Sequence, residues 1–251
     1  MSDIPYQNLA KFYDYFADCE ADSIYAEKIQ SYLKHKSSLN LLDIGCGTGT
    51  FTVEFVRAGY LLDAIDLSPV MIDVARQKAK ESLTESELTR LKFQVADIDE
   101  YDSKTKYDAL LLLTDTMNHI NPISMLTIPK RLSDLTADNG LIIFDLLKHD
   151  FLAEERGDNT WYVELPDADD PKEIMVWENY WDEDNEIATS NFTFFTAENN
   201  LYRRSTDTVT EYFYDHTALI NDFLEHNCIL VDKVDYPERR LIILQKTSPT
   251  Q

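Results

Sequence analysis

The sequence predicts an α/β fold built on a doubly wound, mostly parallel β-sheet. Between residues 39 and 147, short apolar runs alternate with helical patterns in the order β-α-β-α-β-α-β-α-β. Such alternation requires parallel strands joined by helices that cover both faces of the sheet. The run from Ala109 to Leu113 is wholly apolar, as expected for a central strand covered on both sides. A glycine-rich segment directly follows the first run, so we expect a ligand-binding turn at the carboxyl edge of the sheet.

This turn lies in the segment LLDIGCGTGT, residues 41–50, where Gly45, Gly47 and Gly49 alternate with other residues. Glycine lacks a Cβ atom, so it accepts positive φ and lets a ligand lie against the backbone. The following helix start offers free N–H groups. Asp43 precedes the glycines, where it could meet a cationic amino group. The dinucleotide fingerprint G-x-G-x-x-G needs its third glycine one position later, which disfavours NAD.

Acidic residues recur at the ends of the next strands. Asp66 lies 23 positions after Asp43, at the end of the second strand, where a carboxylate can accept both hydroxyls of a ribose. Asp97 ends the third strand and Asp115 follows the fourth. Because the carboxyl ends of parallel strands share one edge, the spacing predicts a single site there.

The glycine motif followed by Asp66, Asp97-Ile98 and the apolar strand before Asp115 resembles the class I S-adenosylmethionine-dependent methyltransferases. The whole chain looks like bacterial candidate small-molecule methyltransferases with an antiparallel insertion after strand five. The resemblance implies a seven-stranded Rossmann-like methyltransferase fold and S-adenosyl-L-methionine as cofactor. The residues expected to bind this cofactor are Tyr13, Asp43, Gly45, Cys46, Gly47, Gly49, Asp66, Leu67, Met71, Asp97, Ile98 and Thr114.

The rest of the chain is expected to elaborate this core. Residues 1–38 predict an N-terminal helical cap, with one helical pattern over 5–35. Residues 39–149 and 215–248 form the cofactor-binding core, which ends in a helix and an antiparallel hairpin. Residues 150–214 predict a small antiparallel β-meander, which could be a lid over the acceptor, a shield for the core, or a homodimer contact. Its three expected strands are Ile174 to Trp181, Ile187 to Phe195 and Leu201 to Tyr214, after which we expect a helix over 216–227.

Composition limits the classes of partner that the protein could bind and indicates a cellular compartment. The 251 residues carry 46 Asp and Glu against 23 Lys and Arg, a net charge of −23, which disfavours nucleic acid and anionic membranes. The same charge could attract a cationic small substrate. The three cysteines are far apart, and the chain begins without a signal-peptide pattern, so we expect a cytoplasmic protein with no disulfide and no metal site.

The resemblance implies transfer of a methyl group, and our hypothesis is that the acceptor is a nitrogen or oxygen atom of a small molecule. The acceptor should lie near the end of the fourth strand, held in line with the methyl carbon. Asp115, His119 and Tyr13 are the candidate catalytic residues, needed as a base only if the acceptor must lose a proton. Two alternatives stay open: a non-catalytic S-adenosylmethionine-binding sensor or protein-interaction module, and an NAD-dependent oxidoreductase.

Overall fold

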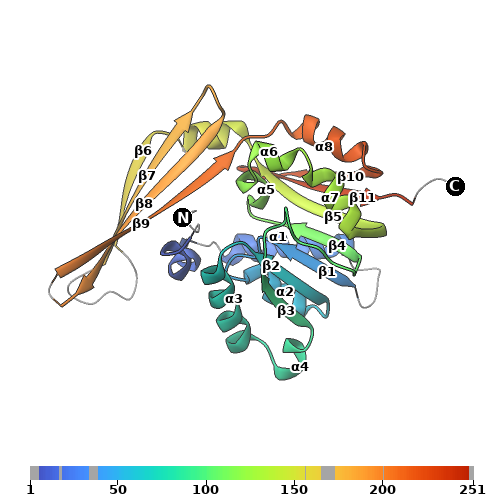
Figure 1. Cartoon of the computed structure of the whole chain (residues 1–251), viewed down its shortest axis with the longest axis horizontal. Coiled ribbons are helices and arrows are strands. Elements are labelled where there is room, and N and C mark those ends of the chain that lie inside the picture. Colours follow the sequence, from blue (N-terminus) through green and yellow to red (C-terminus); the bar gives the residue numbers. More distant parts are fainter. Residues whose placement is uncertain are drawn as a thin grey trace.

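The computed structural model describes residues 6–16, 19–33, 39–155, 157–164, 173–199 and 201–248. Two β-sheets dominate it (Figure 1). Sheet A has seven strands in the order β10-β11-β5-β4-β1-β2-β3, of which β10 and β11 run antiparallel to their neighbours. Its strands are β1 (Asn40–Ile44), β2 (Leu61–Asp66), β3 (Leu91–Val95), β4 (Tyr107–Leu112), β5 (Thr136–Leu147), β10 (Cys228–Asp235) and β11 (Arg239–Lys246).

Helices cover both faces of sheet A, as the sequence predicts. In β4, Ala109 and Leu111 point to one face and pack with α1 to α3, whereas Leu110 and Leu112 point to the other and pack with α7 and α8. The helices are α1 (Cys19–Leu33), α2 (Thr50–Arg57), α3 (Pro69–Ser82), α4 (Glu85–Leu88), α5 (Thr116–His119), α6 (Pro122–Met125), α7 (Ile128–Leu135) and α8 (His216–Leu224). The doubly wound, seven-stranded fold is therefore confirmed. No helix among the described residues is long and apolar enough to cross a membrane.

Sheet B is the antiparallel insertion, and it has one strand more than predicted. Its order is β6-β7-β8-β9, formed by β6 (Asn159–Glu164), β7 (Ile174–Asp182), β8 (Ile187–Glu198) and β9 (Leu201–Tyr212). The unpredicted strand β6 pairs Trp161 with Trp177 of β7. Strand β6 is only six residues long and lies at the edge of sheet B, where its pairing with β7 determines that it forms.

The first part of the N-terminal segment differs from the helical pattern predicted over 5–35. Short helical turns, η1 (Leu9–Lys11) and η2 (Tyr13–Phe16), precede α1. Leu9 and Phe12 pack against Phe194 and its neighbours in sheet B, so burial of these side chains overrides the longer helix. Figure 1 shows these turns between sheet B and α3.

Smaller differences occur near strand β5 and after sheet B. The sequence also predicts a helix over 123–138 that Pro129 bends or breaks, and the structure has two helices there, α6 and α7, with Pro129 in the first turn of α7, where its missing N–H costs nothing. The sequence Asp138-Asn139-Gly140 predicts a turn before the fifth strand, but in the structure these residues belong to β5, with Asn139 at φ 63°. Helix α8 ends at Leu224, three residues before the predicted end.

Candidate active site

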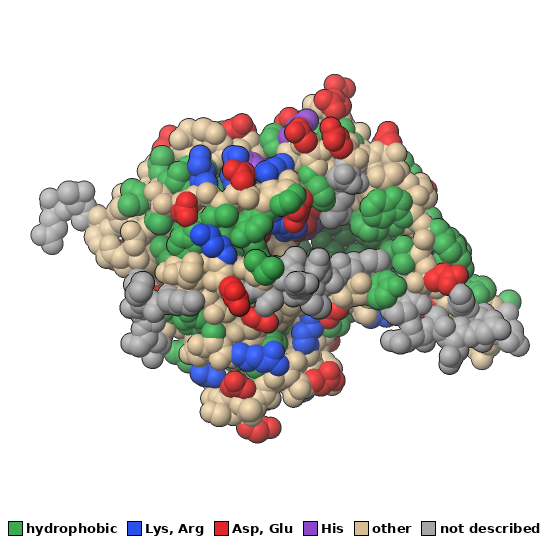
Figure 2. Space-filling view, turned by 180° about the vertical axis from the view of Figure 1, so that it is seen from behind, with side chains coloured by type: hydrophobic (Ala, Val, Ile, Leu, Met, Phe, Trp, Pro, Cys, Tyr) green, Lys and Arg blue, Asp and Glu red, His purple; other side chains and the backbone are tan. Residues whose placement is uncertain are grey.

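A cavity of about 1000 Å³ opens at the carboxyl edge of sheet A. The glycine turn and the ends of β2, β3 and β4 form one wall, while the N-terminal segment and sheet B form the others. Hydrophobic side chains gather around the hollow between the two sheets (Figure 2). Such an enclosed space, where several strand ends meet, is the usual place for a ligand in an open α/β sheet.

The glycine turn presents bare backbone to this cavity. Gly45 has φ +68°, and a Cβ there would lie 2.6 Å from Thr116 Cγ2, so the close approach of α5 requires glycine. Gly47 has φ +53°, and a Cβ there would meet no atom within 4 Å. Gly47 lines the cavity, so its missing side chain leaves room for a ligand against the turn.

Asp66 ties the glycine turn to the start of α3. One carboxylate oxygen accepts the Gly47 N–H at 2.9 Å, and the other accepts the Ser68 N–H at 2.8 Å. Burial raises the pKa of Asp66, although these two N–H groups and His119 act to lower it. Each carboxylate oxygen has a second lone pair, so Asp66 can accept further hydrogen bonds from hydroxyls in the cavity.

Residues 41–140 match a family model described as a methyltransferase domain. The match runs from β1 into β5 and includes the glycine turn. The chain carries a class I S-adenosylmethionine-dependent methyltransferase domain.

Curated relatives align with this chain over part of their length. A candidate methyltransferase of Geobacillus sp. (strain WCH70) is 26% identical over 56% of this chain and 57% of its own. Malonyl-[acyl-carrier protein] O-methyltransferase of Acetivibrio thermocellus is 32% identical over 56% of this chain and 47% of its own. The aligned part thus spans about half the length of these two relatives.

Solved structures share the fold over almost the whole chain. An S-adenosylmethionine-dependent methyltransferase from Clostridium acetobutylicum has a TM-score of 0.72 and 22% identity, covering 97% of this chain and 99% of its own. The sugar N-methyltransferase KedS8 from Streptoalloteichus has a TM-score of 0.78 and 14% identity, covering 99% and 96%. The antiparallel insertion therefore belongs to an architecture already seen in methyltransferases.

The residues around the cavity suit S-adenosylmethionine, whose sulfonium supplies an activated methyl group. Gly47 offers backbone that a Cβ would cover, Asp66 offers acceptors for ribose hydroxyls, and Ile98 offers an apolar surface beside Asp97. Most of the predicted cofactor residues line the cavity, and their individual contacts stay predictions. Those lining it are Tyr13, Gly45, Cys46, Gly47, Asp66, Leu67, Met71, Asp97, Ile98 and Thr114.

Asp43 and Gly49 lie outside the lining. Asp43 is 3% exposed, and its carboxyl accepts the Thr52 hydroxyl at 2.5 Å, behind the turn. Burial raises the pKa of Asp43 to about 7. Gly49 faces α3, where a Cβ would lie 3.0 Å from that of Ala75. The structure gives Asp43 a supporting place beneath the turn, and its contact with the cofactor's amino group stays a prediction.

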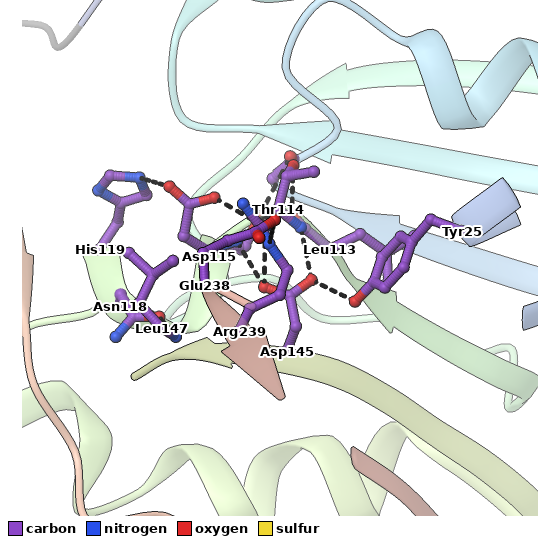
Figure 3. A network of polar contacts seen from close by, with 12 residues as sticks. Tyr25, Leu113, Thr114, Asp115, Asn118, His119, Asp145, Leu147, Glu238 and Arg239 are labelled. Atoms are coloured by element: carbon purple, nitrogen blue, oxygen red, sulfur yellow. Dashed lines mark hydrogen bonds and ion pairs between the residues drawn. The ribbon is translucent and has the colours of Figure 1, made fainter. Parts of the chain in front are cut away.

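The end of β4 has an unusual backbone held by a buried carboxylate (Figure 3). Thr114 and Asp115 are consecutive left-handed residues with φ 52° and 63°. Their N–H groups converge on Asp145, each at 2.7 Å, and Tyr25 donates its hydroxyl to the same carboxylate at 2.7 Å. Left-handed conformations cost about 1–3 kcal/mol each, and the two hydrogen bonds from these N–H groups to one carboxylate offset that cost. Asp145 therefore stabilises the turn that presents Asp115 to the cavity.

Arg239 at the start of β11 supplies the counter-charge. Its Nη1 lies 3.3 Å from Asp115 Oδ1 and 3.4 Å from Asp145 Oδ1, and its Nε lies 3.3 Å from Glu238 (Figure 3). Burial acts to lower the pKa of Arg239, but Asp145 and Asp115 outweigh it and raise that pKa above its usual value. This guanidinium is thus committed to carboxylates of the protein.

His119, at the end of α5, is held in a defined tautomer. Its Nδ1 lies 3.1 Å from the Thr210 carbonyl oxygen, which can only accept, so Nδ1 carries the hydrogen. Its Nε2 lies 3.1 Å from the Tyr6 hydroxyl and 3.8 Å from Asp115 Oδ2. In the neutral imidazole, Nε2 is therefore an acceptor that faces the cavity. The catalytic roles predicted for Asp115, His119 and Tyr13, all of which line the cavity, stay predictions.

Sequence reasoning missed several residues that build this site. Asp145 directly follows the apolar residues 141–144 near the end of β5, which pairs with β4, and that position alone could have suggested it. Glu211 and Arg239 reach the cavity from β9 and β11, far along the chain, and no local pattern marks them. They become visible only once the strand order is known.

Proposed function

We propose that this chain transfers the methyl group of S-adenosylmethionine to a nitrogen or oxygen atom of a small molecule. A single observation carries the proposal: the glycine turn and the end of β4 open into the same cavity, which sheet B closes. A cavity of about 1000 Å³ has room for the methyl donor and a second small ligand side by side.

The chain's own residues would mainly orient the acceptor and exclude water. Tyr6, Leu9 and Tyr13 from the N-terminal segment line the cavity, as do Trp177 and Phe192 of sheet B. Enclosure by these side chains favours displacement at the methyl carbon, because it removes competing water and fixes the acceptor within reach. His119 and Asp115 lie where an acceptor that must lose a proton could give it up.

Charge around the cavity favours a neutral or cationic acceptor. Among the described lining residues there are seven carboxyl side chains against one arginine, and that arginine pairs with carboxylates. The carboxyl groups belong to Asp14, Asp66, Asp97, Asp99, Asp115, Glu211 and Glu238. A carboxylate acceptor, such as the malonyl group in the name of one relative, would be repelled here. An acceptor like the sugar nitrogen in the name of KedS8 would not.

The experiment is a turnover assay that follows S-adenosylhomocysteine release with matched alcohols, phenols, amines and carboxylates. We expect turnover with neutral or amine acceptors, and its loss on removal of the acceptor. Tight binding of S-adenosylmethionine with no turnover over the whole panel would favour the sensor alternative. The methyltransferase family match already disfavours an NAD-dependent oxidoreductase. A homodimer through sheet B and a cytoplasmic location stay proposals, the first to be checked by the molar mass in solution.

A further inference from the structure

We infer that the acceptor carries an aromatic ring, which binds in the corner between Trp161 and Trp177 on sheet B. This inference rests on the proposed function and names the substrate class of the same site. It starts from the arrangement of side chains on the cavity side of sheet B, which neither the sequence motifs nor the family match assigns.

An aromatic row crosses sheet B on its cavity side. Trp161 of β6 is paired with Trp177 of β7, and Trp177 is paired with Phe192 of β8. Residues directly opposite one another on neighbouring strands point to the same face of a sheet, and all three residues line the cavity. The ring centroids lie 4.9 Å apart for Trp161 and Trp177 and 5.2 Å apart for Trp177 and Phe192. The three rings therefore form one continuous aromatic wall.

The Trp161 end of this row is open, whereas the Phe192 end is packed into the core. Phe192 is 5% exposed and belongs to a hydrophobic cluster with Leu9 and Phe12 of the N-terminal segment. Trp161 is 45% exposed, although tryptophan has one of the largest apolar side chains. An exposed tryptophan that lines a cavity offers apolar surface that a ligand can cover.

A second row, of polar side chains, fixes the orientation of the Trp177 ring. The indole Nε1 of Trp177 donates to Asn179 Oδ1 at 2.6 Å, and the Ser190 hydroxyl donates to the same oxygen at 2.6 Å. Asn179 is 1% exposed, and its amide group donates to Asn159 Oδ1 at 2.8 Å. These three polar residues pair across β6, β7 and β8, two positions along each strand from the aromatic row. A ring held in this way loses little freedom when a ligand stacks on it.

The two indole rings meet at an angle that suits a flat aromatic ring. Their planes are 72° apart, so a flat ring that lies parallel to one indole is nearly edge-on to the other. Both arrangements are favourable between aromatic rings, whose faces are negative and whose edges are positive. A saturated ring, such as that of a sugar or a cyclohexane, lacks this charge distribution. The corner between Trp161 and Trp177 therefore favours an aromatic ring.

The aromatic row lies some distance from the residues proposed to act on the acceptor. Phe192 is paired with Asp207 of β9. Glu211, four residues further along the same strand, has a carboxylate oxygen within 4.8 Å of atoms of Asp115 and His119. Strand residues advance by about 3.3 Å each, so the two levels are roughly 13 Å apart along β9. An acceptor that reaches both levels is elongated, with its ring on the order of 10 Å from the methylated atom.

The first test compares two neutral alcohols that differ only in the terminal ring. Calorimetry on the full chain saturated with S-adenosylhomocysteine would use 6-phenylhexan-1-ol and 6-cyclohexylhexan-1-ol, which both separate the ring from the hydroxyl by a long chain. The cyclohexyl compound is the more apolar, so burial of apolar surface alone would favour it. We expect the phenyl compound to bind at least threefold more tightly. Equal affinity, tighter binding of the cyclohexyl compound, or binding of neither would overturn the inference.

Variants of Trp161 locate the ring. Trp161→Leu removes one side of the corner at an exposed position of the edge strand β6, so the fold should persist. We expect this variant to bind the phenyl compound about fivefold more weakly, to lose the preference over the cyclohexyl compound, and to bind S-adenosylhomocysteine as wild type does. Trp161→Phe keeps an aromatic ring and should retain part of the preference. If Trp161→Leu weakens all three ligands equally, the role of Trp161 is structural and the inference fails.

Trp181→Leu is the matched control. Trp181 lies on the same strand as Trp177, but it is outside the cavity lining and its ring contacts that of His149. The same substitution there should leave the affinity for both alcohols within twofold. A loss of preference as large as that of Trp161→Leu would show that any tryptophan removed from sheet B has this effect, and the specific ring site would be wrong.

NMR spectra of the ligand give a second readout that does not depend on affinity. A ring beside an indole experiences its ring current, so the phenyl protons of the bound alcohol should shift with wild type and shift less with Trp161→Leu. Equal shifts with both proteins would overturn the inference. If S-adenosylhomocysteine does not bind, the proposed function itself fails; if it binds and the phenyl compound is not preferred, the aromatic inference fails while the proposed function stands.

Discussion

The carboxylate of Asp145 accepts the backbone N–H of Asp115 at 2.7 Å and so fixes the residue that faces the acceptor side of the cavity. Asp145 is fully buried, and every hydrogen bond the structure gives it is one in which it accepts. An ionised carboxylate suits this environment because it has no hydrogen to donate.

Replacing Asp145 should therefore be costly. In Asp145→Asn the amide NH₂ would face a donor, either a backbone N–H or the Tyr25 hydroxyl, and Arg239 would lose a counter-charge. We expect the free energy of unfolding to fall by about 2–4 kcal/mol, in the range for breaking a buried pair. Urea denaturation measures this, with Asp134→Asn as an exposed control expected within about 0.5 kcal/mol of wild type. If Asp145→Asn lowers the free energy of unfolding no more than Asp134→Asn does, the turn at Thr114 and Asp115 does not need the charge of the Asp145 carboxylate.

Asp43 should make stability depend on pH. Because burial raises its pKa from 3.8 to about 7, the native state keeps a proton that the unfolded chain releases near pH 4. The contribution of Asp43 to the free energy of unfolding therefore falls as pH rises from about 4 to 7. Asp43→Asn removes this titration, so it should gain stability relative to wild type between pH 5 and pH 8, by roughly 2.7 kcal/mol, because the two pH units from 5 to 7 contribute about 1.36 kcal/mol each. If the free energies of unfolding of Asp43→Asn and wild type differ by the same amount at pH 5 and at pH 8, the pKa of Asp43 is not raised in the native state.

Gly47 should matter for the ligand more than for the fold. A Cβ at Gly47 enters open space beside the cavity, whereas one at Gly59 (φ +103°) lies 3.8 Å from Arg90 and outside the cavity. Both alanine variants carry a positive-φ cost of about 1–2 kcal/mol, so Gly59→Ala is the matched control for strain. We expect Gly47→Ala to weaken S-adenosylhomocysteine binding more than tenfold in calorimetry and Gly59→Ala to leave it within twofold. Equal affinities would mean that the ligand does not lie against the turn.

The N-terminal segment should open when its anchor is removed. Asp207 of β9 accepts the N–H groups of Asn8 and Leu9, each at 2.7 Å, while Asp14 pairs with Lys78 of α3 at 2.7 Å. In Asp207→Asn we expect the amides of Asn8 and Leu9 to exchange hydrogen at least tenfold faster. Asp184→Asn, in the exposed turn between β7 and β8, serves as the control. Unchanged exchange at both amides would show that Asp207 does not hold the segment.

The parallel core could be predicted because its signals are local. The apolar run from Ala109 to Leu113 marks a central strand, and Gly45 with Gly47 marks the turn after the first strand. Because helices join these parallel strands in chain order, the carboxyl ends of the strands lie at one edge of the sheet. Asp66 and Asp115 were found in this way.

The rest depends on partners distant in sequence. Strand β6 forms because Trp161 pairs with Trp177, and the N-terminal turns form because Phe12 stacks on Phe194. Glu211 and Arg239 reach the cavity only because β9 and β11 are placed beside it. A single sequence carries no local trace of such contacts.

The most direct test of the central claim is calorimetric titration with S-adenosylmethionine, S-adenosylhomocysteine and NAD. It would use wild type, Asp66→Asn, and Asp73→Asn on the exposed side of α3 as the control. We expect both adenosyl ligands to bind wild type and the control alike, at least tenfold weaker binding to Asp66→Asn, and no binding of NAD. Absence of adenosyl binding, or binding that Asp66→Asn leaves unchanged, would contradict the assignment of this cavity to S-adenosylmethionine.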